Sequence, residues 1–80
     1  MIIKTHTGKL LNMAQIQSIE VCESSHPSVD AYWPNGQQTE IICIDWMLGS
    51  STAEMVETAR VYIDAIAAAY MRGERLFEVV

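Results

Sequence analysis

Apolar and polar residues alternate over short stretches in the first half of the chain, a pattern typical of β-strands with one buried face. The alternation predicts strands at about 2–6, 9–11, 16–23, 29–34 and 37–46. Asn12 is expected to cap a short helical turn after the second of them. The strongest turn signal is Trp33-Pro34-Asn35-Gly36, because glycine accepts the left-handed backbone of a bulged hairpin.

After Ser51, apolar residues recur every three or four positions, which predicts one long helix at about 52–72. Ser51 and Glu54 have the spacing of a capping box, and Gly73 supplies a C-terminal stop. The tail at 74–80 either adds a short strand or stays loose. We therefore expect a single α+β domain over all 80 residues, with an antiparallel meander of three to five strands packed in two layers on one C-terminal helix.

The predicted helix carries more apolar residues than one sheet needs. The stripe expected to cover the sheet consists of Val56, Ala59, Ile63, Ile66 and Tyr70, widened by Met55, Tyr62 and Ala67. The surplus on the opposite side consists of Val61, Ala65, Ala68 and Met71. These residues are either ordinary helix formers that stand singly in solvent, or the interface of a homodimer formed by antiparallel helix pairing.

Charge is unevenly distributed along the chain, whose net charge is −5. No Lys or Arg occurs between Leu10 and Ala59, where seven acidic residues fall. Affinity for nucleic acid comes largely from Lys and Arg that neutralise phosphates, so we expect no direct nucleic-acid ligand. A protein partner with a basic surface is the more natural expectation.

Strand alternation also predicts which acidic residues share a surface. The partner-binding face is expected to have an apolar centre with an acidic rim and to comprise Glu20, Glu23, Asp30, Tyr32, Ile41 and Asp45, with Cys43 beside them. An apolar centre with a polar rim is typical of docking surfaces. A solvated strand edge has a similar composition, and that interpretation stays open.

The hydrophobic content of 50% argues against a disordered chain. No apolar run reaches the roughly 18–20 residues that span a bilayer, so no membrane segment is expected. The first residues lack the long apolar core of a signal peptide, and two cysteines do not form a disulfide framework. We therefore expect a cytoplasmic protein with reduced thiols.

Cys22 and His26 are the one close Cys/His pair in the sequence. Zinc sites usually present two such pairs, whereas the further candidates here, Cys43 and His6, stand alone on separate elements. Acidic neighbours on both sides of Cys22 disfavour a reactive thiolate. We expect no catalytic residue, metal or cofactor, and a small Cys/His metal-binding or thiol protein is the lesser alternative.

The order of these motifs resembles that of a broad set of small uncharacterised bacterial and phage single-domain proteins. The residues that carry the resemblance are "IKT…G…N" at 3–12, "I..IEV" at 16–21, "NG" at 35–36 and the helix start at 51–54. The resemblance implies the strand–helix layout and no active site. In size and charge the chain is also similar to phage-encoded inhibitors, anti-CRISPR proteins among them, which block a basic nucleic-acid channel.

These observations predict a non-enzymatic interaction module, homodimeric, that binds a basic protein surface. An inhibitor or nucleic-acid mimic is the sharpest form of this hypothesis. A structural subunit of a larger complex is the alternative, since such a subunit also needs no active site.

Overall fold

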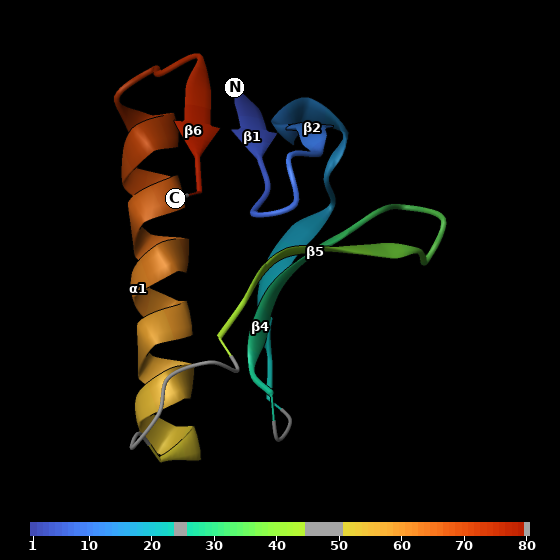
Figure 1. Cartoon of the computed structure of the whole chain (residues 1–80). Helices are drawn as coiled ribbons and strands as arrows, with labels where there is room; N and C mark the ends of the chain where they lie inside the picture. Colours follow the sequence, from blue (N-terminus) through green and yellow to red (C-terminus); the bar gives the residue numbers. More distant parts are fainter. Residues whose placement is uncertain (24–25, 45–50, 80) are drawn as a thin grey trace.

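The computed structural model describes residues 1–23, 26–44 and 51–79. The elements follow one another as β1 (Ile2–Lys4), β2 (Leu10–Asn12), the 3₁₀ helix η1 (Met13–Gln15), β3 (Ser18–Cys22), β4 (Ser28–Tyr32), β5 (Gln38–Cys43), α1 (Thr52–Met71) and β6 (Leu76–Glu78). The single long helix lies alongside the strands (Figure 1). The α+β class expected from the sequence is confirmed.

The strands form two three-stranded sheets. In the second sheet, β3, β4 and β5 are a continuous antiparallel meander. In the first sheet, β1 pairs antiparallel with β2 and parallel with β6, so that Ile2 lies opposite Leu76. The tail, left open by the sequence, is therefore a strand. Alternation indicates where strands lie but not which strands pair, and pairing between the two ends of the chain has no local signal.

The core lies between α1 and the inner faces of both sheets. It consists of Ile3, Leu11, Val29, Ala31, Ile41, Ile42, Ile44, Met55, Ala59, Ile66 and Val79. The buried stripe of α1 departs from expectation near its end, where Ala69 is buried and Tyr70 is 55% exposed. The residues of α1 that contact the sheets follow one another at alternating steps of four and three residues. The step of three from Ile66 leads to Ala69 and not to Tyr70.

Local capping and turn signals work as the sequence indicates. Ser51 Oγ accepts a hydrogen bond from the Glu54 backbone N–H at 3.2 Å, which starts α1. Asn12 Oδ1 accepts one from the Ala14 N–H at 3.0 Å and starts η1. Gly36 takes a φ of +87° at the tip of the hairpin between β4 and β5. These short-range contacts fix where α1 and η1 begin and where the chain turns between β4 and β5.

A β-bulge interrupts β5. Val29 lies opposite Ile42, whereas Asp30 lies opposite Glu40, so Ile41 is an extra residue without a partner on β4. Ile41 and Ile42 are both buried, at 0% and 6% exposure. Strict alternation predicted an outward Ile41, and that prediction is wrong because the bulge reverses the facing of the strand at this point.

Candidate interaction surface

The outer face of the second sheet carries a row of three carboxylates. Glu20 on β3 lies directly opposite Asp30 on β4, and Asp30 lies directly opposite Glu40 on β5. Adjacent strands are about 4.8 Å apart, and like charges directly opposite each other destabilise a sheet. The rest of the fold must therefore offset the electrostatic cost of this carboxylate row.

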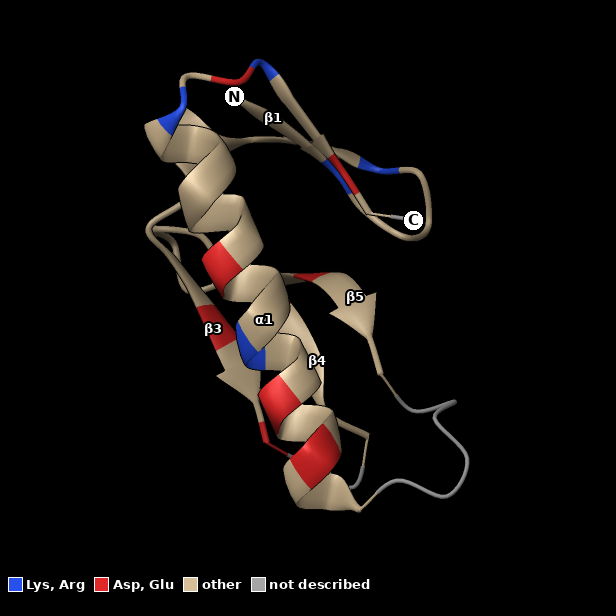
Figure 2. Cartoon of the chain, turned by 90° about the vertical axis from the view of Figure 1, so that its left-hand side faces the viewer, with Lys and Arg blue, Asp and Glu red and all other residues tan. Residues whose placement is uncertain are grey.

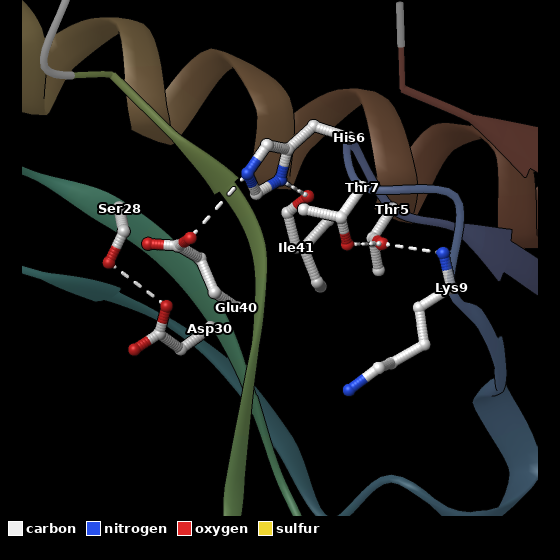
Figure 3. Close-up of polar contacts among 8 residues, drawn as sticks. All are labelled: Thr5, His6, Thr7, Lys9, Ser28, Asp30, Glu40 and Ile41. Carbon is white, nitrogen blue, oxygen red and sulfur yellow. Dashed lines mark hydrogen bonds and ion pairs between the residues drawn. The ribbon is translucent and has the colours of Figure 1, made fainter.

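Asp30 is the centre of the carboxylate row and is only 4% exposed. Its Oδ1 accepts a hydrogen bond from Ser28 Oγ at 2.9 Å, drawn in Figure 3, and its Oδ2 accepts one from Gln38 Nε2, also at 2.9 Å. The expectation that Asp30 belongs to an exposed rim is therefore wrong. Asp30 lies on the central strand, where Ser28 of the same strand and Gln38 of β5 hold its carboxylate.

The two ends of the carboxylate row are exposed. Glu20 accepts a hydrogen bond from Ser18 Oγ at 2.9 Å, and Glu40 stands at the β5 end. The sequence pattern did not assign Glu40 to this face. Strict alternation, counted back from the inward Ile42, places Glu40 on the inner face, but the extra residue of the bulge moves it to the outer face. Counting residue pairs outward from the Asn-Gly hairpin, and not back from Ile42, places Glu40 opposite Asp30 and predicts its outward position.

The other expected acidic residues lie apart from the row. Glu23 is exposed just after β3, and its Oε1 is 3.5 Å from Arg60 Nη2 on α1, so part of its charge is compensated within the chain. Asp45 lies outside the described residues. The face that the structure brings together is therefore Glu20, Asp30 and Glu40 with Tyr32 beside them.

Tyr32 lies opposite Ser18 and Gln38, one row along the same face. Desolvation raises the pKa of its phenol above the ordinary value of 10.0, and negative charge at Asp30, Cys22 and Glu20 raises this pKa further. The phenol is consequently a neutral hydrogen-bonding group at physiological pH. It supplies the partly apolar surface that was expected beside the acidic residues.

Cys22 and Cys43 both lie opposite Ser28, one on each side of β4. Two strand spacings, roughly 9–10 Å, separate them, whereas disulfides join residues whose Cα atoms are within about 7 Å. No disulfide joins them. Within the described ranges, no group of three His, Cys, Asp or Glu side chains is arranged to hold a metal ion.

His6, which follows β1 of the first sheet, forms hydrogen bonds to the bulge in the second sheet (Figure 3). Its backbone N–H donates to the Ile41 carbonyl at 3.0 Å, and Nδ1 lies 2.8 Å from the same oxygen. A carbonyl only accepts, so Nδ1 carries the proton of this bond. Nε2 is 3.5 Å from Glu40 Oε2, which places the imidazole at the end of the carboxylate row.

The turn before β2 holds His6 in this position. Thr5 is buried, and its Oγ1 accepts a hydrogen bond from the Lys9 backbone N–H at 3.0 Å. The same oxygen is 3.1 Å from Thr7 Oγ1. Backbone bonds from Thr5 N to Lys9 O and from Gly8 N to Thr5 O close the turn.

The surplus apolar residues of α1 lie mostly in solvent. Val61 is 60% and Met71 is 84% exposed, Ala68 is exposed and Ala65 is half-buried. Figure 2 views this outer side of the helix, where a basic segment lies among the acidic ones and another basic segment lies at the C-terminal end. The structure thus places three of the four expected interface residues on an open face.

An open hollow of about 540 Å³ lies between the hairpin tip and η1. It is lined by Ala14, Gln15, Ile16, Trp33, Pro34, Asn35 and Gln37. Trp33 is half-buried, and its Nε1 donates to Thr39 Oγ1 at 3.0 Å. The lining has no titratable group, so it provides no acid, base or nucleophile.

Comparison with known proteins yields no match of this chain to a family model, to a curated protein or to a solved structure. Among the helices of the described segments, none has the length and apolar character needed to cross a bilayer.

Proposed function

We propose that the protein is a non-enzymatic interaction module whose carboxylate row binds a basic protein surface. The observation that carries the proposal is the direct cross-strand alignment of Glu20, Asp30 and Glu40. Like charges at opposed positions lower the stability of a sheet. A cationic partner relieves the repulsion between these carboxylates, so the bound protein lacks the electrostatic cost that the unbound protein carries.

The surroundings of the row support this assignment. The second sheet contributes no Lys or Arg, because none occurs from Leu10 to Ala59. The buried Asp30 is held by Ser28 and Gln38, which fixes the centre of the row before a partner arrives. A pre-organised charged surface loses little conformational entropy on binding.

In its sharpest form the proposal describes an inhibitor that occupies a basic nucleic-acid channel, as an anti-CRISPR protein or nucleic-acid mimic does. The small size and the net charge of −5 support this form. A structural subunit that docks on a basic neighbour would use the same face. The two forms differ in whether the bound partner loses its nucleic acid.

A matched pair of double variants tests the proposal. The first, Glu20→Lys with Glu40→Lys, reverses the exposed ends of the carboxylate row. The second, Glu54→Lys with Glu57→Lys, makes the same change in net charge on α1. The probe is a fluorescent nona-arginine peptide, followed by anisotropy at several salt concentrations.

We expect the sheet variant to lose at least tenfold in affinity and most of the salt dependence, since screening acts on surface charges. The helix variant should lose much less. Equal losses in the two variants would show that only net charge attracts the probe, and the proposal would be abandoned. Circular dichroism establishes that both variants are folded.

A further inference from the structure

The outer side of α1, which faces away from both sheets, carries a regular seam. Val61, Asp64, Ala68 and Met71 follow one another at steps of three, four and three residues. This is the spacing at which two helices pack against each other along their length. Val61 and Met71 are large apolar side chains in solvent at 60% and 84% exposure.

Acidic residues together with Arg60 lie along the first part of this side of α1, whereas a basic residue alone lies at its C-terminal end (Figure 2). Asp64 lies before Ala68, and Arg72 is the C-cap residue of the helix. Within the described chain Arg60 pairs with Glu57 and Glu23, and Arg72 pairs with Glu74. Among the described residues, Asp64 forms no ion pair.

We propose that a second copy of this chain packs its α1 antiparallel on this seam, with Ala68 at the two-fold axis. A methyl side chain at the crossing lets the two helices approach to about 8 Å. Asp64 lies one turn before Ala68 and Arg72 one turn after it, about 6 Å along the axis in each direction. Asp64 of each copy therefore faces Arg72 of the other.

The opposite charges of Asp64 and Arg72, one turn on either side of Ala68, select this occupant and this orientation. A parallel copy would place acidic residues against acidic residues and arginines against arginines. An antiparallel copy pairs Asp64 of one helix with Arg72 of the other, twice by symmetry. Met71 then packs over Ala65 of the second copy, which removes from water the most exposed large apolar side chain of the described residues.

The interface leaves the carboxylate row open. Because α1 covers the inner face of the second sheet, the dimer has sheets outside and helices inside, with the two rows on opposite outer surfaces. The helix of 20 residues is about 30 Å long. One such seam buries less than the roughly 800 Å² per partner of a standard interface, so we expect a dissociation constant in the micromolar range.

Sedimentation equilibrium of the full chain, from micromolar to millimolar concentration, tests the proposal. Wild type is expected to move from 9.0 kDa towards twice that mass as concentration rises. Asp64→Arg alone and Arg72→Asp alone should each weaken dimerisation at least tenfold. An equimolar mixture of the two should associate again, because each reversed charge then faces an opposite one.

The controls are Glu20→Arg and Lys9→Asp, which make the same charge changes outside the seam and should leave the dimer intact. Circular dichroism and the unfolding transition show that each variant folds. A wild type that stays at 9.0 kDa at millimolar concentration would overturn the proposal. So would a dimer that survives both reversals, or folded variants whose mixture remains monomeric. None of these measurements depends on what the carboxylate row binds.

Discussion

His6 donates two hydrogen bonds to the carbonyl oxygen of Ile41, one from its backbone N–H at 3.0 Å and one from Nδ1 at 2.8 Å. Ile41 is the extra residue of the β5 bulge. The bulge thus exposes a carbonyl that the β4–β5 ladder does not use, and the first sheet uses it as its attachment to the second. The same bulge buries Ile41 and turns Glu40 outward, so one irregularity joins the sheets and completes the carboxylate row.

The side-chain bond from His6 can be removed separately. His6→Leu should lower the free energy of unfolding by about 1 kcal/mol, the usual net worth of such a bond. His6→Asn keeps an N–H donor near the position of Nδ1 and should retain most of the stability. Urea denaturation measures both. If both variants lose the same free energy of unfolding, the side-chain N–H donor at position 6 contributes nothing to stability.

Burial of Ile41 predicts a large effect of truncation. Ile41→Ala should cost about 2–5 kcal/mol, the range for large-to-small changes in a core. Thr39→Ala, two positions earlier on the same strand and half-buried, serves as the comparison and should cost less. Chemical denaturation at constant salt gives both values. An Ile41→Ala variant as stable as wild type would contradict the inward position of this side chain.

The raised pKa of Tyr32 predicts an effect of alkaline pH. A phenol with a higher pKa in the folded protein holds its proton more tightly there than in the unfolded chain. Its contribution to stability is therefore complete below pH 10.0, the ordinary pKa, and is lost as the pH rises through the folded value. The absorbance difference at high pH between wild type and Tyr32→Phe should show a midpoint above 10.0.

Two further measurements belong to this titration. Glu20→Gln should lower the midpoint only slightly, because desolvation is the largest cause of the shift and Glu20 the smallest. Tyr32→Phe should flatten the fall in stability above pH 10.0. A Tyr32 that titrates at the ordinary value would show that the phenol has full contact with water.

The hairpin tip predicts a backbone effect. Gly36 has a φ of +87°, and apart from Gly36 and its two chain neighbours no residue has an atom within 4 Å of the position that a Cβ would take. Gly36→Ala should therefore cost about 1 kcal/mol through backbone strain alone. Gly36→Asn should cost less, because Asn tolerates the left-handed region better. Thermal unfolding followed by circular dichroism distinguishes the two. An unchanged transition in Gly36→Ala would contradict this turn geometry.

Sequence reasoning succeeded where a signal is local. Ser51, Asn12 and Gly36 each act within three or four residues of their own position, and the structure has the cap or turn that each predicts. Placement of Glu20 and Tyr32 on one face also followed from simple alternation within β3 and β4.

The failures share a different cause. Ile41 and Glu40 were turned the wrong way because one extra residue reverses the facing of a strand without changing its composition. Asp30 was called exposed because an alternating pattern reports a face and not the depth at which neighbouring side chains cover it. The use of His6 as a link between sheets depends on two segments 35 residues apart, which no local pattern records.

The pairing of β1 with β6 has a consequence for how the protein is made. Ile2 and Leu76 are neighbours in the sheet although 74 positions separate them in sequence, since 76 − 2 = 74. A ribosome releases the chain from its first residues onward, so β1 emerges long before its parallel partner exists. The meander of β3, β4 and β5 has only local connections and can form first. The first sheet is then completed only after β6 has been synthesised, and until that moment one edge of β1 is an open template for the wrong strand.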